Sequence, residues 1–255
     1  MRPLRTIGAA ALVVTASLLG QAACAAESAA LVHMSWPHDG LFGTFDRAAA
    51  QRGFQVYREV CSACHGLTYV AFRNLTELGF SEEQVAALAA EYSVTDGPDD
   101  EGEMFERPAR PADPIPPPYP NPQAARVANG GALPPELSLI TKARAGGTDY
   151  AYSLMVGYEE PPADEPEREG LYYNAHFPGH WIAMPPPLSE GVVSYEDGTE
   201  ATVPQMAADV ATFLTWAAEP TLEERKQSGL KVTLFLIVFT GLAYATMRKI
   251  WADAH

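Results

Sequence analysis

Cys61-Ser62-Ala63-Cys64-His65 is the stretch that decides how this sequence folds. Two cysteines separated by two residues, with a histidine directly after the second, form the C-x-x-C-H motif of c-type haem attachment. Thiols at this spacing can add to the two vinyl groups on one edge of a porphyrin, and the next imidazole then lies under the iron. The motif predicts one covalently bound haem c per chain, with His65 as an axial ligand.

Two other uses of a cysteine pair fit this sequence less well. A thioredoxin-like redox pair needs a βαβ setting, whereas the residues on either side of this motif have a helical pattern. A structural zinc site needs further cysteines or histidines at ligand spacing, and the sequence has no second cysteine pair. The haem interpretation therefore stands.

The helix before the motif is capped by Thr44 or Asp46 and delivers the cysteines at its C-terminal end. Its apolar stripe, at helical spacing, consists of Ala49, Phe54, Tyr57 and Val60. Gly53 lies beside this stripe. It either lets another helix approach closely or is a tolerated surface glycine.

The sixth iron ligand decides between electron transfer and an open site for gas or peroxide chemistry. The candidates downstream are Met104, Met155, Met184, Met206, His176 and His180. Met184 precedes three prolines, which fix φ and force an extended path, so its thioether is held in one direction. We predict Met184 as the ligand. Pro178 and Gly179 disfavour a helix between the two histidines, which we interpret as loop residues near the haem edge.

The N-terminus has the layout of a secretory signal peptide, predicted over residues 1–25. A basic start is followed by an apolar run from Ile7 to Leu19 and by Ala23-Cys24-Ala25, a small-residue cleavage pattern. A first transmembrane helix or a lipoprotein anchor at Cys24 fits less well, because the apolar run is short and Gln21 is not aliphatic. The haem domain, residues 26–222, is therefore expected in the periplasm.

A second apolar segment near the C-terminus predicts a membrane anchor over residues 229–251. Sixteen uncharged residues lie between Lys231 and Arg248, which can snorkel, and Trp251 is an interface anchor. A helix over Pro204–Ala218 precedes it, so residues 223–228 are only a short tether. Residues 252–255 are the expected cytoplasmic tail. These features predict a single-pass protein of the bacterial inner membrane; a buried soluble helix is the alternative.

The composition predicts a mainly α fold with long loops and an acidic surface. The net charge is −15 with a sequence pI of about 4.7, which argues against nucleic acid and for a cationic partner. Residues 96–106 and residues 159–169 each carry six carboxylates, which form either a solvated face or a docking surface for a basic protein. Eight prolines within residues 108–122 predict an extended loop. Arg126 either pairs with a haem propionate or is an ordinary surface arginine.

With these residues assembled, the chain resembles the cytochrome c1 family, the c-type haem subunits of the cytochrome bc1 complex. The likeness covers nearly the whole chain after the signal peptide. Its ordered landmarks are Arg52–His65, Asp96-Gly-Pro, Gly102–Phe105, Pro118–Pro122, Asn129–Ser138, Gly170–Asn174, Met184-Pro-Pro-Pro and Trp216–Pro220.

The resemblance implies a class I cytochrome c-like haem domain with long insertions, plus a C-terminal transmembrane helix. It implies axial ligands at His65 and Met184, a propionate contact at Arg126 and a haem-pocket tyrosine at Tyr57. Some bacterial members have an additional disulfide near the methionine loop. This chain cannot form one, because no cysteine follows Cys64, so residues 159–181 need another stiffening device, for which their prolines are candidates.

The function that the resemblance implies is electron transfer from a Rieske iron–sulfur protein to a soluble cytochrome c, beside cytochrome b in a dimeric complex. The isolated chain is then no catalyst, although it is a component of a ubiquinol–cytochrome c oxidoreductase. Two alternatives stay open at this point. One is an independent membrane-tethered cytochrome shuttle, which needs a long flexible linker. The other is a haem enzyme with an open distal site, which binds carbon monoxide readily.

Overall fold

The computed structural model describes residues 30–252. The signal peptide expected over residues 1–25, and all but the first residue of the expected tail, lie outside the described residues. The helices are α2 (Arg47–Glu59), α3 (Glu82–Ala90), α4 (Pro122–Ala128), α5 (Ile140–Ala143), α6 (Gly147–Val156), α7 (Val203–Ala218) and α8 (Leu222–Ile250), with 3-10 turns η1 (Cys61–Ala63) and η2 (Phe72–Leu78).

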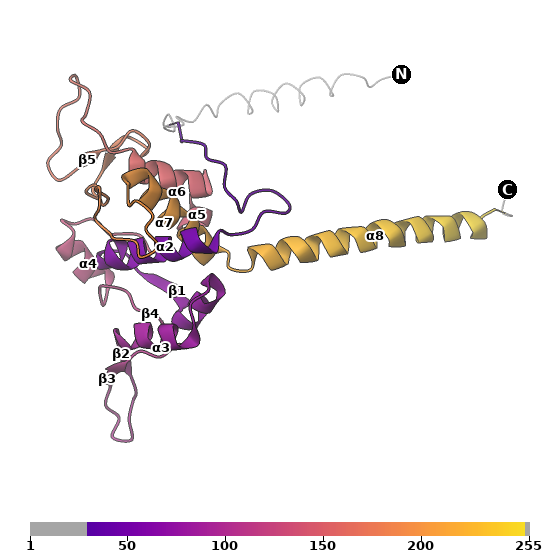
Figure 1. The fold of residues 1–255 in the computed structure, drawn as a ribbon, viewed down its shortest axis with the longest axis horizontal. Coiled ribbons are helices and arrows are strands. Elements are labelled where there is room, and N and C mark those ends of the chain that lie inside the picture. The colour runs from indigo at the N-terminus through magenta and orange to yellow at the C-terminus, as the bar shows by residue number, and fades with distance from the viewer. Residues whose placement is uncertain (1–29, 253–255) are drawn as a thin grey trace, which may run out of the picture.

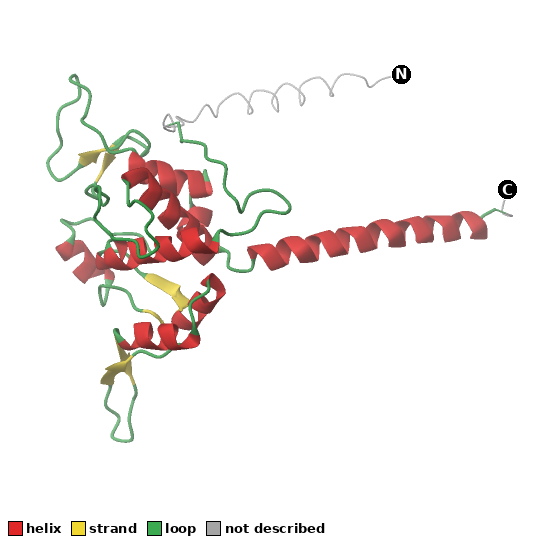
Figure 2. Cartoon of the chain, in the orientation of Figure 1, coloured by secondary structure: helices red, strands yellow, loops and turns green. Residues whose placement is uncertain are grey.

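The fold is mainly helical with long loops, as predicted (Figures 1 and 2). The strands of the described part of the chain pair as three small antiparallel sheets. These join β1 (Leu67–Ala71) to β4 (Pro114–Ile115), β2 (Ser93–Asp96) to β3 (Phe105–Pro108), and β5 (Tyr172–Tyr173) to β6 (Trp181–Ile182). Between Pro108 at the end of β3 and Pro122 at the start of α4, the proline-rich segment contains only the two-residue β4, because proline has no N–H to donate to a sheet.

Helices α2 and α7 pack directly against each other, and Gly53 is the reason that they can. A Cβ atom at position 53 would lie 2.0 Å from the Asp209 carbonyl oxygen and 2.7 Å from the Phe213 Cβ. The close-approach interpretation of Gly53 is confirmed. Asp46 is the N-cap of α2, since its Oδ1 accepts a hydrogen bond from the Ala49 N–H at 3.1 Å.

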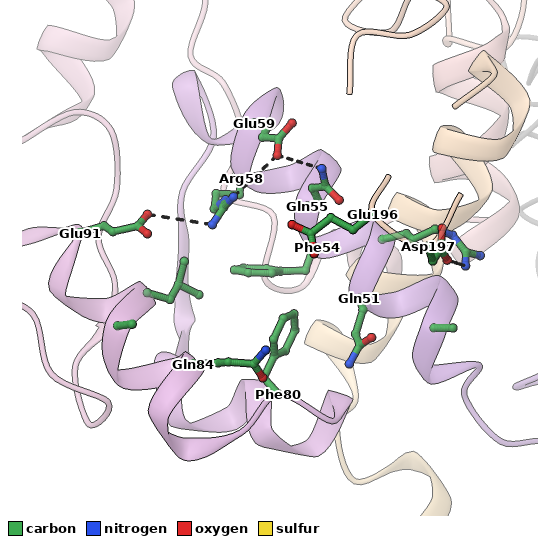
Figure 3. A pocket seen from close by; sticks show the side chains of 14 residues that line it. Gln51, Phe54, Gln55, Arg58, Glu59, Phe80, Gln84, Glu91, Glu196 and Asp197 are labelled. Atoms are coloured by element: carbon green, nitrogen blue, oxygen red, sulfur yellow. Dashed lines mark hydrogen bonds and ion pairs between the residues drawn. The ribbon is translucent and has the colours of Figure 1, made fainter. Parts of the chain in front are cut away.

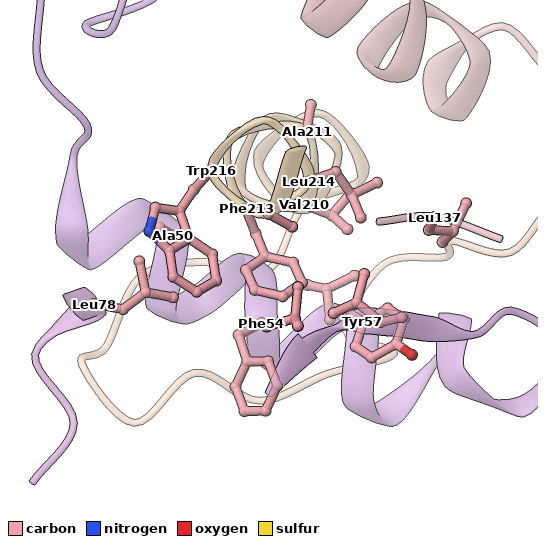
Figure 4. Packing of buried hydrophobic residues seen from close by; sticks show 14 of the residues in the cluster. Ala50, Phe54, Tyr57, Leu78, Leu137, Val210, Ala211, Phe213, Leu214 and Trp216 are labelled. Carbon is pink, nitrogen blue, oxygen red and sulfur yellow. The ribbon is translucent and has the colours of Figure 1, made fainter. Parts of the chain in front are cut away.

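An aromatic cluster fills the space between these two helices (Figure 4). The Phe213 ring lies 5.5 Å from Phe54, 5.8 Å from Tyr57 and 5.8 Å from Trp216, measured between ring centroids. All four side chains are buried. Aromatic pairs at these distances add to the stabilisation that comes from burial alone. The cluster fixes the helix that delivers the haem motif.

A buried ion pair ties the same two helices together. The Arg52 guanidinium donates to both carboxylate oxygens of Asp209 at 2.9 Å, and its third nitrogen contacts Asp197, also at 2.9 Å. The hydrogen bonds to Asp209 raise the pKa of Arg52, so the pair stays charged. Because Asp209 is buried, loss of Arg52 would leave an uncompensated charge in the core.

Helix α8 leaves the domain as one long rod (Figure 1). Among the described residues, α8 is the one helix that is long and apolar enough to cross a membrane. None of its apolar stretch is buried against the domain. Residues 223–228, expected as a tether, are the first turns of this same helix. The domain and the membrane span are therefore joined by a continuous helical segment after the short turn at Glu219–Thr221.

Candidate haem site

The attachment motif is one tight turn at the C-terminal end of α2. The Ser62 hydroxyl donates to the Arg58 carbonyl at 2.7 Å, which continues the helical path beyond the last turn. The backbone N–H groups of Cys64 and His65 both donate to the Cys61 carbonyl, at 3.1 and 2.9 Å. Cys61 and Cys64 carry free, half-buried thiols. The turn therefore brings two thiols and an imidazole together on one short segment.

The imidazole of His65 is oriented by a backbone carbonyl. Its Nδ1 lies 2.7 Å from the Pro135 oxygen, and because a carbonyl only accepts, Nδ1 carries the proton. Nε2 is then left with a free lone pair, which is the form that ligates a metal. Burial lowers the pKa of His65, so the ring is held neutral.

The segment that presents Pro135 is fastened to Gly66 and to β1, directly after His65 in the chain. The Glu136 carboxylate accepts from the Thr68 N–H at 2.8 Å and from the Ser138 N–H at 2.8 Å. The Leu137 N–H donates to the Gly66 carbonyl at 3.0 Å, and the Tyr69 N–H donates to the Ser138 hydroxyl at 3.1 Å. These contacts fix the position of the Pro135 oxygen. The sequence identifies residues 129–138 as a family landmark. It does not predict that these residues position the Pro135 oxygen beside His65.

Tyr57 links the core to the motif. Its hydroxyl donates to the His65 carbonyl at 3.1 Å, and its ring belongs to the aromatic cluster. Burial, as the largest cause, raises the pKa of Tyr57, so the phenol stays protonated and remains a donor. The side chain predicted as a haem-pocket tyrosine thus contacts the backbone of the predicted proximal ligand.

Met184 is held by a separate set of contacts. It follows β6, is half-buried, and its carbonyl accepts a hydrogen bond from the Tyr158 hydroxyl at 3.0 Å. Burial raises the pKa of Tyr158, which keeps this donor protonated. Tyr158 itself forms an isolated β-bridge with Asn174. No local pattern indicates a role for this tyrosine, because the contact joins residues 26 apart in the chain.

Asn174 is the centre of the loop that precedes Met184. This buried amide donates to the Leu154 carbonyl at 2.8 Å, and its oxygen accepts from the backbone of His176 and Phe177 at 3.0 and 3.1 Å. The backbone N–H of Asn174 also donates to the His180 carbonyl at 2.7 Å. A buried side chain that satisfies several backbone groups stiffens a loop that has no disulfide.

Trp181 adds a second link across the same loop. Its indole N–H donates to the Glu165 carboxylate at 2.9 Å, and the Arg168 guanidinium lies over its ring at 5.2 Å. The pairing of β5 with β6 closes the segment between them. Hydrogen bonds and strand pairing thus stiffen the loop over residues 159–181, a role for which its prolines were the expected candidates.

Arg126 lies on the last turn of α4 and is exposed. One of its guanidinium nitrogens donates to the Gly131 carbonyl at 2.9 Å, which fastens the turn after α4. Arg126 therefore has a local structural contact of its own, and its other N–H groups are not used by that bond.

The other candidate ligands occupy different places. Met206 is fully buried in the core, Met155 is half-buried against it, and Met104 is exposed on the β2–β3 hairpin. His176 and His180 both lie in the loop, as predicted; His176 contacts the Ala30 carbonyl at 2.5 Å and His180 stacks on Tyr173.

A surface groove of about 520 Å³ between α2 and α3 is a separate feature (Figure 3). It contains none of the predicted site residues. Its charges pair with one another: Arg58 lies 3.7 Å from Glu59 and 4.0 Å from Glu91. It has no donor set for a haem.

The donor chemistry of the described residues fits haem c better than zinc. Two free thiols at C-x-x-C spacing precede an imidazole whose Nε2 is free. A zinc site built on the same cysteines needs several such side chains converging on one point. Between residues 30 and 252, no group of three or more His, Cys, Asp or Glu converges in that way.

Comparison with known proteins identifies the family. The cytochrome C1 family profile matches residues 36–254. The cytochrome c1 of Rhodospirillum rubrum is 50% identical over 252 residues, covering 92% of this chain and 93% of that protein. The mitochondrial cytochrome c1-2 heme protein of Solanum tuberosum is 52% identical over 215 residues, covering 84% of this chain and 82% of that protein. The cytochrome b/c1 of Bradyrhizobium diazoefficiens is 54% identical over 242 residues, or 86% of this chain, but the chain spans only 35% of that protein's length. This chain belongs to the cytochrome c1 family.

Proposed function

We propose that this chain is the electron-transfer subunit of a cytochrome bc1 complex. The names of its relatives support this function, since one is a cytochrome b/c1 and another, from Candida albicans, a cytochrome b-c1 complex catalytic subunit. The observation that carries the proposal is the hydrogen bond from His65 Nδ1 to Pro135, which leaves Nε2 free for iron.

The residues that would hold the cofactor are those that the attachment motif and the proline-flanked methionine predict. Cys61 and Cys64 would form the two thioether links, and His65 and Met184 would ligate the iron. A bound haem c supplies a one-electron carrier whose potential a His/Met pair raises. With His65 and Met184 both as iron ligands, no position would be open for substrate chemistry at the iron.

The surrounding side chains keep these ligands in place. The carbonyls of Pro135 and His65 and the hydroxyl of Tyr57 fix the proximal imidazole, while Tyr158 fixes the backbone at Met184. The N–H groups of Arg126 that do not bond Gly131 are suited to a propionate. An arginine there also raises the potential, because a positive charge favours the reduced state.

The partners follow from the family and from the charge of the surface. We propose cytochrome b and a Rieske iron–sulfur protein as neighbours in a dimeric complex, and a basic soluble cytochrome c as acceptor. Of the two acidic clusters, residues 159–169 are the better docking surface. In the other cluster Asp96, Asp99 and Glu106 are engaged by Arg107, by backbone N–H groups and by hydroxyls within the hairpin.

The location follows from the anchor and from the expected signal peptide over residues 1–25. We propose that α8 crosses the bacterial inner membrane with residues 26–222 on the periplasmic side and residues 252–255 in the cytoplasm. Glu223 and Lys226, in the first turns of α8, both contact the chain before α2. Such a fastened joint disfavours the alternative of a freely swinging cytochrome shuttle.

Purification and spectroscopy test this function. Solubilised in mild detergent, the chain should leave the membrane together with cytochrome b and a Rieske protein, and its ferrous haem should be low-spin and resistant to carbon monoxide. A chain that purifies without partner proteins would favour the shuttle, and ready binding of carbon monoxide would favour the haem enzyme.

A substitution tests the distal ligand. Met184→Leu should lower the midpoint potential strongly and stop electron transfer from the Rieske centre. An unchanged potential would exclude Met184 as ligand.

A further inference from the structure

A rigid turn precedes α2, and its backbone is tightly constrained. The Asp39 N–H donates to the Trp36 carbonyl at 3.0 Å, and the Thr44 N–H donates to the Pro37 carbonyl at 3.0 Å. A Cβ atom at Gly43 would lie 1.9 Å from the Asp39 oxygen, so only glycine fits there. The turn therefore holds a defined shape.

The first turns of α8 fasten this turn to the membrane helix. The Lys226 ammonium donates to the carbonyls of His38 and Gly43 at 2.6 and 3.2 Å, bridging the two ends of the turn. The Glu223 carboxylate accepts from the Phe45 N–H at 2.8 Å and from the Arg47 guanidinium, also at 2.8 Å. Figure 1 shows the indigo segment before α2 extending toward the side from which α8 leaves.

The tip of the turn carries two exposed apolar side chains. Leu41 is 56% exposed and Phe42 is 78% exposed. Together with Gln227 and Leu230 of α8 they line a crevice of about 160 Å³ between the turn and the helix. A solvated turn gains nothing from two adjacent large apolar side chains at its tip, so the pair indicates an apolar environment.

The position of the crevice along α8 identifies that environment. Leu230 is two residues, or about 3 Å of helix rise, before Val232, where the uncharged span begins. The polar interfacial layer of a bilayer is about 5–7 Å thick on each side of the hydrocarbon. Leu41 and Phe42 thus lie beside the part of the helix that passes through this layer.

We propose that Leu41 and Phe42 insert into the lipid interface as a second membrane contact of the haem domain. The inference rests on α8 as a membrane span and not on the haem ligands. A single helix leaves the domain free to tilt relative to the membrane plane. A second contact, beside the helix axis and joined to α8 through Lys226 and Glu223, restricts this tilt and holds the domain at a defined inclination to the membrane surface.

Site-specific photocrosslinking tests this contact in the full-length chain in its own membranes. Phe42 is replaced by benzoylphenylalanine, as is Leu41 in a second variant. The control carries the same residue at Val127, which is 86% exposed. Val127 belongs to α4, and this helix lies on the side of the domain away from α8 (Figure 1). Covalent haem, stained on a denaturing gel, verifies that each variant has folded.

After irradiation, mass spectrometry of the labelled peptide should find phospholipid adducts at position 42 or 41 and none at position 127. A crosslink from both positions to a neighbouring protein subunit would overturn the proposal and make the turn a subunit contact. The absence of any adduct at both positions, in variants with normal haem content, would also overturn it, because the tip would then face water.

Discussion

His65 and Met184, the two proposed iron ligands, are held by regions of very different construction. His65 follows α2, which packs on α7 through Gly53 and a buried aromatic cluster, and its ring is fixed by the Pro135 carbonyl. Met184 follows the two-residue strand β6 and precedes three prolines, two of them exposed. Its backbone is fixed by Tyr158 and, further away, by Asn174.

One proposed ligand therefore belongs to the core of the fold and the other to a loop. Core packing and helix hydrogen bonds are lost only when the domain unfolds, whereas a segment with few buried apolar contacts can open locally at lower free energy. We therefore expect the Met184 side to yield first under heat, mutation or denaturant.

The largest contrast is expected when each ligand is removed in turn. Met184→Ala should keep the covalent haem, open the sixth position to carbon monoxide, and lower the potential by a sizeable part of the roughly 0.8 V over which axial ligands act. His65→Ala should prevent formation of a low-spin haem altogether. Redox titration and visible spectroscopy measure both. Equal loss of haem in the two variants would contradict the contrast.

On the His65 side, Gly53→Ala should reduce the stability of the domain more than any other substitution that adds one methyl group. The added Cβ meets the Asp209 backbone at 2.0 Å, so α2 and α7 must separate, and overpacking of this kind costs about 3 kcal/mol of unfolding free energy or more.

The matched control for this substitution is Gly229→Ala on α8, where nothing outside the helix's own backbone lies within 4 Å of the new Cβ. Thermal unfolding followed by far-ultraviolet circular dichroism in detergent should show a lower midpoint for the first variant only. Equal midpoints would mean that the two helices are not closely packed.

Tyr57 and Tyr158 offer the same chemical change on the two sides. Each hydroxyl donates to the backbone carbonyl of a proposed ligand residue, so Tyr57→Phe and Tyr158→Phe each remove one hydrogen bond worth about 1 kcal/mol. We expect Tyr158→Phe to raise the fraction of molecules with Met184 detached, measured by the absorption band of sulfur–iron ligation. Tyr57→Phe should leave that band unchanged; an equal effect would contradict the assignment.

The smallest effect is expected from Asp113, which supports the His65 side from a distance. The Arg107 guanidinium lowers the pKa of Asp113 to about 2, below the ordinary value of about 3.9. Because the folded pKa is the lower one, its stabilising contribution is complete above about pH 4 and is lost as the pH falls through about 2.

Asp113→Asn should therefore be less stable than the wild type at neutral pH and equal to it below about pH 2. Acid unfolding curves measure this difference, with Asp100→Asn in the exposed hairpin turn as control. A difference that stays constant between pH 6 and pH 2 would show that Asp113 acts by some means other than its charge.

The sequence predicted those features that depend on local patterns. Residue spacing identified the attachment motif, and helical periodicity placed Gly53 beside the apolar stripe. Capping preferences offered Asp46 as one of two N-cap candidates, and Asp46 is the N-cap. Pro135, Tyr158 and Asn174 were missed for a common reason. Each makes at least one contact with a residue distant in sequence, 70 residues away between Pro135 and His65, 26 between Tyr158 and Met184 and 20 between Asn174 and Leu154, and no residue spacing encodes such a contact. The ligand roles of His65 and Met184 remain predictions.

One measurement tests the central claim, that a core-held His65 and a loop-held Met184 ligate the same iron. The wild-type ferric protein is heated while the sulfur–iron absorption band and the helical circular dichroism are recorded together. We predict that the band is present at low temperature and disappears several degrees before the helices melt. Absence of the band at low temperature would contradict the ligation by Met184, and coincident transitions would contradict the difference between the two regions.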